Sequence, residues 1–222
     1  MKKLLSAALA AVLTLSLAAC SGAPETKEFT TAELSQILST AISENSDGMA
    51  DVITTDSLSA ATDWLTANKG MSEEEAKAFM DKYNALSYEE IDSTLTEKGF
   101  TAEEIADFQQ AEGTARASQM VFDTLGITAE DIEAGALSIS LINVRAYGMA
   151  LIKPAEGKEE AVLSACQNFV ALQQKNFETY LQDQYAIAKE AKCETINGYV
   201  VMVMGENSDA IYQAISDSLN AK

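Results

Sequence analysis

Three cysteines carry the most reactive side chains of this 222-residue sequence, which contains no histidine. Cys20 follows an uncharged stretch near the start, whereas Cys166 and Cys193 lie much further along the chain. A thiol is a point of covalent attachment, and two thiols can pair in a disulfide. The absence of histidine excludes acid–base catalysis by imidazole and histidine-rich metal sites. The chemistry of this chain therefore depends first on the surroundings of its cysteines.

The segment before Cys20 has the pattern of an export signal. Lys2 and Lys3 give it a positive start, and residues 4–19 form a run of 16 residues without a charge. As a helix this run would reach about 24 Å, which is short of the roughly 30 Å hydrocarbon core of a bilayer. We therefore expect residues 1–19 to be a cleaved signal peptide rather than a permanent transmembrane helix.

The tetrapeptide Leu17-Ala18-Ala19-Cys20 resembles the lipobox of bacterial lipoproteins. The resemblance implies transfer of a diacylglyceryl group to the Cys20 sulfur and cleavage between Ala19 and Cys20. Two or more acyl chains would hold the protein stably on the extracytoplasmic face of the cell membrane. An ordinary secreted protein with an incidental cysteine is the alternative. Residues 20–28 are small and polar and lack apolar periodicity, so we expect a flexible tether.

Charge divides the chain that would remain after cleavage. Residues 20–135 carry 24 acidic and 6 basic side chains, a net charge of −18, whereas residues 136–222 carry 10 and 7, a net charge of −3. Such an acidic protein does not suit nucleic acid, whose phosphates require clusters of Lys and Arg. An acidic protein also does not bind electrostatically to anionic lipid, so a link to the membrane should be covalent. We expect a solvated acidic surface, with a cation-binding or base-binding face as the alternative.

The acidic part, residues 29–135, is expected to consist of short amphipathic helices. A recurrent phrase, in which glycine and an apolar residue precede Ser or Thr and then carboxylates, begins at Gly70, Gly99 and Gly126. Glycine closes one helix, the hydroxyl caps the next, and the carboxylates meet its positive end. We interpret the phrase as helix punctuation rather than as a repeat array. The predicted helices are 30–44, 72–86, 87–98, 101–112 and 114–125, with a further helix that begins near Asp56 or Ser57.

The pattern changes to alternating strands and helices in residues 136–222. Asn197-Gly198 is the sequence of a tight hairpin turn, and the apolar run after it predicts a central, buried strand. We expect an α+β fold, in which the acidic multi-helix region precedes a ββαββα domain with an antiparallel or mixed sheet covered by helices. The predicted elements are strands 137–144 and 147–153, a long helix 156–185, strands 187–196 and 199–204, and a helix 208–219.

Two stretches of this part, Tyr147–Val162 and Asn176–Gly205, carry a helix that ends in Phe-x-x-Tyr and a Gly-Tyr-Val-Val hairpin. They are similar to lipoproteins of domain-of-unknown-function family 4358, and the family-like region covers about residues 120–219. The resemblance implies the lipid site and the fold, but it implies no reaction and no catalytic residue. Phe177 and Tyr180 at the end of that helix are expected in the core between helix and sheet, rather than in a pocket.

Helix and strand periodicity place the two later cysteines on inward faces. Cys166 shares a helix face with Val162 and Phe169, while Cys193 points away from the side of Lys192 and Glu194. An exported protein tolerates a disulfide between Cys166 and Cys193. Two separate buried thiols are the favoured interpretation, because residues this far apart need not meet.

The sequence offers no recognisable catalytic motif. It has no Gly-x-Ser-x-Gly, no Ser-x-x-Lys, no Gly-x-Gly-x-x-Gly and no phosphate-binding loop. Residues 45–48 are expected to be a turn rather than a calcium loop. We therefore expect no enzyme activity, no cofactor and no metal. The leading hypothesis is a tethered interaction or accessory module of the cell envelope, with an unknown envelope protein as partner. The alternative is a receptor lipoprotein for a small ligand or metal.

Overall fold

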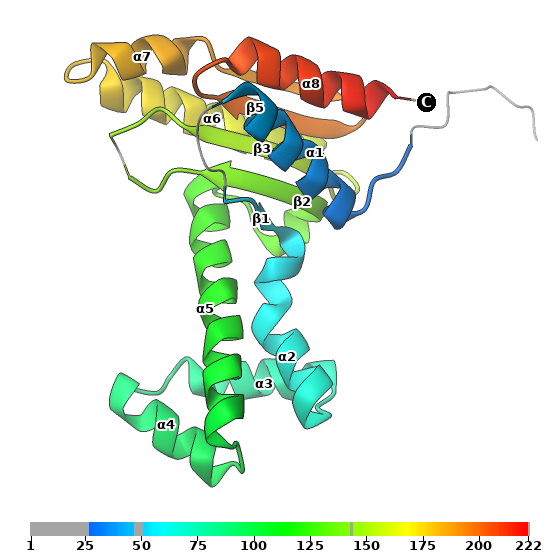
Figure 1. Cartoon of the computed structure of the whole chain (residues 1–222), viewed down its shortest axis with the longest axis vertical. Coiled ribbons are helices and arrows are strands. Elements are labelled where there is room, and N and C mark those ends of the chain that lie inside the picture. Colours follow the sequence, from blue (N-terminus) through cyan, green and yellow to red (C-terminus); the bar gives the residue numbers. More distant parts are fainter. Residues whose placement is uncertain (1–26, 47–50, 143, 222) are drawn as a thin grey trace, which may run out of the picture.

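The computed structural model describes residues 27–46, 51–142 and 144–221. The predicted signal peptide, the cleavage site at Ala19 and Cys20, and most of the tether lie outside these ranges, as do Asp47 and Gly48. Figure 1 shows a five-stranded sheet with helices on both faces, and an arm of helices that projects away from it. This architecture confirms the predicted α+β class.

The five strands form one antiparallel sheet. They are β1 (Ile53–Thr54), β2 (Ile132–Ile139), β3 (Gly148–Pro154), β4 (Lys192–Ile196) and β5 (Tyr199–Met204), in the order β1-β2-β3-β5-β4. β5 lies between β3 and β4, and all its residues are buried, as its apolar sequence predicts. Asn197 and Gly198 join β4 to β5 with φ angles of 49° and 82°, which confirms the predicted hairpin turn.

Two helices from opposite ends of the chain cover one face of the sheet. They are α1 (Thr31–Asn45) and α8 (Ser208–Asn220), and they lie side by side in Figure 1. Leu34 and Leu38 of α1 and Ile211 and Ile215 of α8 are fully buried in the core on this side. Both α1 and β1 come from the acidic region 29–135, yet they belong to the layers of the sheet.

The strand β2 begins at Ile132, five residues earlier than expected, and it ends at Ile139 rather than Val144. Its first half contains Ala134, Gly135 and Ala136, which have weak strand propensity. These small residues allow α1 to pack against the strand, and Ala136 is fully buried there. Burial beneath a helix therefore overrides the local preference of this segment.

The other face is covered by α6 (Glu159–Phe177) and α7 (Gln182–Lys189). The expected single helix 156–185 is wrong, because the chain turns over residues 178–181 and Leu181 is not helical, with φ −133° and ψ 76°. The Gln174 side chain donates a hydrogen bond of 2.9 Å to the carbonyl of Ala188, which holds α7 back against α6. The expected strand 187–196 is consequently shorter, since residues 187–189 end α7 and β4 starts at Lys192.

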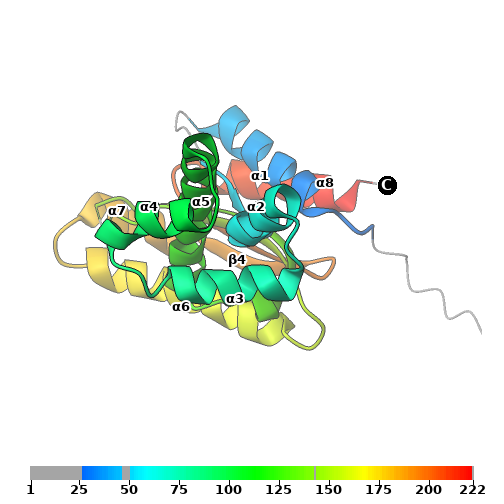
Figure 2. The same ribbon diagram turned by 90° about the horizontal axis from the view of Figure 1, so that it is seen from below.

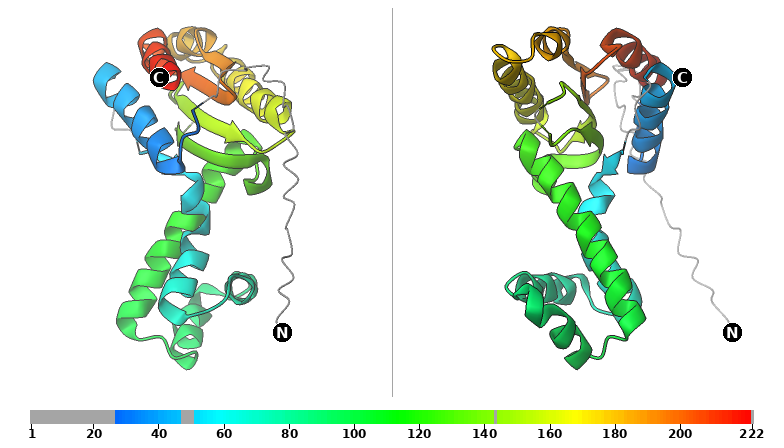
Figure 3. Two further views of the ribbon diagram at one scale, coloured as in Figure 1. Left: turned by 90° about the vertical axis from the view of Figure 1, so that its right-hand side faces the viewer. Right: turned by 60° about the vertical axis from the view of Figure 1, so that its left-hand side comes forward.

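Four helices build the arm, which we define as residues 55–119. After a short 3-10 turn, η1 (Thr55–Ser59), the chain forms α2 (Ala60–Lys69), α3 (Glu73–Tyr83), α4 (Tyr88–Glu97) and the long helix α5 (Ala102–Leu125). Figures 1 and 3 show α2 running along α5, with α3 and α4 at the far end, and Figure 2 gives the view from that end. The expected break between helices 101–112 and 114–125 is wrong, because α5 continues through Gly113.

The predicted helix punctuation is confirmed at the arm and at its junction with the sheet. Gly70, Gly99 and Gly126 all have positive φ angles, between 65° and 81°. Ser72, Thr101 and Thr128 each complete a reciprocal cap with a carboxylate three residues later. Thr128 caps the short turn η2 (Ala129–Asp131) that leads into β2.

The arm has a hydrophobic core of its own, separate from the two cores of the sheet. Phe108 of α5 is fully buried at its centre and meets Tyr83 edge to face, with 5.1 Å between ring centroids. The other members come from each arm helix and from the turn before α5: Ala61, Leu65, Ala76, Leu95 and Phe100, with Trp64 and Phe79 at the border. The C-terminal part of α5 instead packs Val121 and Phe122 into the sheet core. Helix α5 therefore contributes to both the arm core and the sheet core as one continuous helix.

Candidate functional site

The surface of the arm is hollowed where α2 and α3 meet α5. A cavity of about 490 Å³ lies there, with Leu58, Ala61 and Met80 among its apolar residues. A second cavity, of about 410 Å³, extends toward α4 and includes Tyr88 and Ile91. Both cavities share the polar side chains Asn84, Glu112 and Arg116. We call the two cavities together the arm groove.

The ion pair of Glu112 and Arg116 lies where the two cavities meet. These residues are four apart on α5, and the Arg116 Nε–H donates to Glu112 Oε1 at 2.8 Å, with a further bond from a terminal nitrogen. The Glu112 side chain is 13% exposed, whereas the Arg116 side chain is 63% exposed. Hydrogen bonding to Glu112 raises the pKa of Arg116, which stays cationic. Because a guanidinium has five N–H donors, donors remain for an oxygen atom in the groove.

The phenol of Tyr83 lines the second cavity next to this pair. The residue is only 4% exposed. Burial, and then the negative charge of Glu112, raise the pKa of Tyr83, so the hydroxyl stays neutral at physiological pH. Asn84, Tyr83 and Arg116 thus give the groove an amide, a hydroxyl and a cation beside aliphatic walls.

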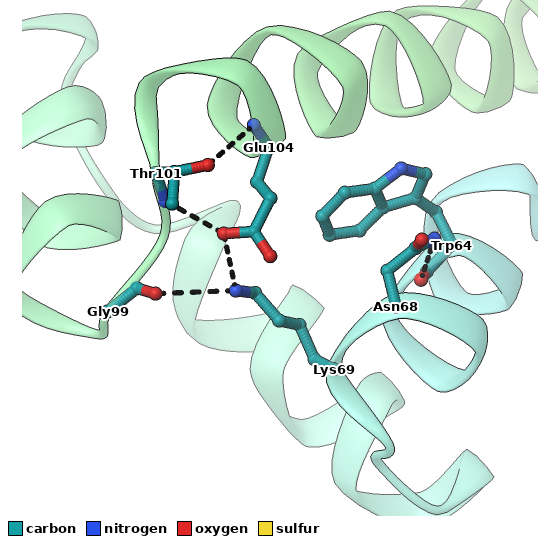
Figure 4. A network of polar contacts seen from close by, with 6 residues as sticks. All are labelled: Trp64, Asn68, Lys69, Gly99, Thr101 and Glu104. Carbon is teal, nitrogen blue, oxygen red and sulfur yellow. Dashed lines mark hydrogen bonds and ion pairs between the residues drawn. The ribbon is translucent and has the colours of Figure 1, made fainter.

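A polar network fixes the helices that carry these walls (Figure 4). Lys69, at the end of α2, lies 2.8 Å from Glu104 in the first turn of α5 and donates to the carbonyl of Gly99 at 3.3 Å. Glu104 also accepts the Thr101 N–H at 2.8 Å. The Lys69 ammonium lies 4.2 Å from the centroid of the Phe100 ring. Hydrogen bonding from Lys69, the largest cause, lowers the pKa of Glu104. The network joins the ends of α2 and α5 at the far end of the arm.

The arm groove combines apolar walls with an amide, a hydroxyl and a cation. Apolar walls bury a ligand surface, and a few convergent polar groups fix its orientation. Among the residues that the structure describes, no group of three or more Asp, Glu or Cys side chains is placed to hold a metal ion. The expected turn at residues 45–48 is described only at Asn45 and Ser46, which end α1.

The prediction that Phe177 and Tyr180 lie in the core is confirmed for one residue and wrong for the other. Phe177 is buried in the core of the sheet, as expected, but Tyr180 is 86% exposed, so the expectation of a core position is wrong for Tyr180. The cause is the end of α6 at Phe177, after which Tyr180 lies in a turn. Leu172, which lies on α6 itself, is 52% exposed.

Cys166 and Cys193 are brought together, although their separation in sequence suggests otherwise. Cys166 lies on α6 and Cys193 on β4, both as free thiols, and Cys193 packs against the core that contains Cys166. The neighbouring Cys193 thiol, and then burial, raise the pKa of Cys166. Sequence reasoning placed both on inward faces but had no measure of their distance.

The arm groove itself is absent from the sequence-based predictions. Its one available signal is the spacing of Glu112 and Arg116 on a helix, which predicts an ion pair. That spacing does not distinguish a groove from an ordinary solvated helix face. The cavity exists because α2, α3 and α5 meet at this point, which is a property of the tertiary structure.

Comparison with known proteins relates part of the chain to a family. Residues 106–205 match the family model described as "Domain of unknown function (DUF4358)", which is 100 of the 222 residues, just under half of the chain. This match confirms the family similarity of the part that runs from the second turn of α5 to the end of β5 and contains four of the five described strands. No curated protein and no solved structure matches the chain. No helix in the described ranges is long and apolar enough to cross a bilayer.

Proposed function

We propose that this protein is a membrane-anchored extracytoplasmic lipoprotein that binds another component of the cell envelope through the arm groove and catalyses no reaction. The observation that carries the binding role is the arm itself. It has its own buried core, it continues into the sheet through α5, and it presents a concave surface with a cation and apolar walls. Helices α2, α3 and α4 lie outside the family match, whereas most of α5 lies within it.

Charge favours a partner with a basic surface. Residues 55–119 carry 14 acidic and 5 basic side chains, a net charge of −9. Such a field attracts basic partners and repels acidic ones during encounter. Within it, Arg116 offers donors inside the groove, which suits a carbonyl or carboxylate oxygen of the partner. We therefore expect a basic envelope protein that inserts an acceptor side chain or backbone carbonyl beside Arg116.

The start of the described chain supports the tethered position. The Phe29 N–H donates to the Tyr199 hydroxyl at 2.9 Å, and Phe29 packs its ring against Tyr199. The polypeptide is thus fixed to the sheet within ten residues of Cys20. A short tether of this kind would keep the body near the membrane while the arm extends from it.

Site-specific photocrosslinking in the host cell tests the binding role. A photoreactive amino acid at Gln119, which lines the groove, should give a discrete crosslinked product. The matched control is Thr114, which is exposed on the same helix but lies on a different face from Glu112. Equal products from both positions, or none from Gln119, would contradict the proposal.

Metabolic labelling with a fatty-acid analogue tests the anchor separately. The wild-type protein should carry the label and sediment with membranes, and Cys20→Ala should lose both properties. Cys193→Ala is the matched cysteine control and should keep the label. An unlabelled wild-type protein that retains residues 1–19 would refute the lipoprotein assignment.

A second candidate function, a small-ligand receptor, is favoured by one observation: Arg116 lines a cavity of about 490 Å³, the size of a small-molecule site. Thermal-shift measurements with a panel of amino acids, sugars, short peptides and metal ions test it. A dose-dependent rise in Tm that Arg116→Gln abolishes and Arg145→Gln preserves would support the receptor. A flat response to the whole panel would leave the interaction module as the better assignment.

A further inference from the structure

Cys193 lies on the edge strand β4, and its two neighbours show which way its side chain points. Lys192 Nζ lies 2.9 Å from Asp209 Oδ1, and the Tyr212 hydroxyl donates to Glu194 Oε2 at 2.9 Å. Both partners belong to α8. Since side chains alternate along a strand, Cys193 points to the opposite face of the sheet, toward α6.

Helix α6 presents Cys166 to the same space. Cys166 is fully buried in the core between α6 and the sheet, together with Val162 and Phe169. Cys193 packs against this core, half-buried, and its sulfur lies 4.0 Å from the Leu163 carbonyl oxygen, one turn before Cys166. Leu163 and Cys166 are three residues apart on α6, so they lie on neighbouring positions of one helix face. Cys166 and Cys193 are therefore neighbours that face each other across a helix–sheet interface.

We propose that Cys166 and Cys193 form a disulfide bond that fastens α6 to β4 when the protein meets a thiol–disulfide oxidant. The inference is independent of the arm groove and of the lipid anchor. The sequence favours separate thiols because the residues are 27 positions apart, but the fold removes that objection. The position of the Cys193 sulfur beside the Leu163 carbonyl carries the proposal, and the packing of both cysteines in one core supports it.

The accessibility of the two sulfurs gives the order of the reaction with glutathione disulfide. Cys193, the more exposed residue, attacks one sulfur of the oxidant as a thiolate, breaks its S–S bond and releases one glutathione thiolate. Cys166 then loses its proton and attacks the Cys193 sulfur, which releases the second glutathione thiolate. Two protein thiols are oxidised and one glutathione disulfide is reduced to two glutathione molecules. The neighbouring Cys166 thiol lowers the pKa of Cys193, which favours this order.

The bond would close a loop that contains the end of α6, all of α7 and the entry into β4. β4 pairs with β5 along one side only, because it is the last strand of the sheet. A covalent link to α6 would hold this edge strand in place and restrict the unfolded chain. We expect the oxidised protein to melt about 10 °C higher than the reduced protein.

The test uses the full chain with Cys20→Ala, so that Cys166 and Cys193 are its two remaining thiols. After incubation with glutathione disulfide, the intact mass should fall by about 2 Da. Neither thiol should react with N-ethylmaleimide under denaturing conditions until a reductant is added, and peptide mapping should recover residues 166 and 193 in one linked fragment. The rise in Tm should appear with oxidation and disappear with reduction.

The matched control adds Cys193→Ser, a change of one atom at the less buried position. Reduced, this variant should melt within about 2 °C of the reduced parent, and oxidant should neither lower its mass nor raise its Tm. Three results would overturn the proposal: full alkylation of both parent thiols after oxidation, a glutathione adduct on either thiol as the stable product, or a disulfide between two chains. None of them bears on crosslinking at Gln119 or on labelling at Cys20.

Discussion

The Lys158 ammonium lies 2.8 Å from the Asp131 carboxylate, and this ion pair joins the turn before β2 to the start of α6. The same carboxylate accepts the N–H and the hydroxyl of Thr128, at 3.0 and 2.7 Å. These bonds, with that from Lys158 the largest cause, lower the pKa of Asp131 to about 2. One side chain thus closes the turn between α5 and β2 and links that turn to the start of α6.

Asp131→Asn should destabilise the protein by about 1 kcal/mol at pH 7. The full pKa shift would imply more, but the Asp131 side chain is 20% exposed and solvent screens the pair. Because the folded-state pKa lies below the ordinary value of 3.8, the stabilisation is present above pH 4 and is lost as the pH falls toward 2. Urea unfolding at several pH values should show the gap between wild type and variant closing over that window. Glu133→Gln, at an exposed position nearby, should change stability by less than about 0.5 kcal/mol.

Alanine at two glycines should have opposite effects. At Gly148 in β3, an added Cβ would lie 2.6 Å from a ring carbon of Phe169, so Gly148→Ala should destabilise the fold by about 1–3 kcal/mol. At Gly113, exposed within α5, an added Cβ meets no atom within 4 Å. Gly113→Ala should therefore stabilise the protein by about 0.5–1 kcal/mol. Thermal melting of both variants checks the signs, and a loss of stability in Gly113→Ala would contradict a continuous α5.

Phe108→Ala should loosen the arm while the sheet persists. Phe108 is fully buried among aromatic rings, and its removal should cost the arm core about 3–5 kcal/mol. Hydrogen exchange should accelerate in α2, α3 and α4 and should stay slow in β3 and β5. Met120→Ala, on the same helix at a residue 54% exposed, is the control and should leave exchange in the arm unchanged. Uniform acceleration in arm and sheet would show that the two unfold as one unit.

Tyr199→Phe should release the start of the described chain. Tyr199 is 1% exposed, and loss of its hydroxyl leaves the Phe29 N–H without its acceptor, at an expected cost of about 1 kcal/mol. The Phe29 amide should then exchange faster with solvent. Tyr212→Phe removes a hydroxyl that bonds Glu194 near the surface, and it should change stability by less than about 0.5 kcal/mol. Unaltered exchange at Phe29 would show that this hydroxyl does not fix the segment.

The sequence predicted well where local signals and burial agree. The caps at Ser72 and Thr101, the Asn197-Gly198 turn and the buried β5 all follow from the residues present, because capping and turn chemistry act over three or four residues. The sequence-based prediction failed where contacts between distant residues determine the bounds of a helix or strand. Gly113 is a plausible helix break in isolation, but Phe108 before it and Phe122 after it are each buried in a core, so α5 continues.

The sites were harder to predict than the elements. The two-residue strand β1 forms by pairing with Leu137 and Ala136, which are more than eighty residues away. No local sequence pattern predicts this strand. The end of α6 at Phe177 depends on the packing of α7 against α6, which the hydrogen bond from the Gln174 side chain to the Ala188 carbonyl holds in place. The arm groove and the meeting of Cys166 with Cys193 both arise from such distant packing. Periodicity indicates which face of a helix or strand carries a side chain. The residue that this side chain contacts on another element depends on the tertiary structure.

The bond between Phe29 and Tyr199 also determines where mechanical load enters the molecule. A pull on the chain that precedes residue 27 would be shared between the backbone that enters α1 and the bond from Phe29 to Tyr199, at the first position of β5. That strand pairs with β3 on one side and β4 on the other, so this bond fastens the leading segment to an interior strand of the sheet. The arm leaves the sheet after β1 and returns at β2, and β3 separates these two strands from β5. A protein pulled by its leading end would therefore keep the shape of its groove.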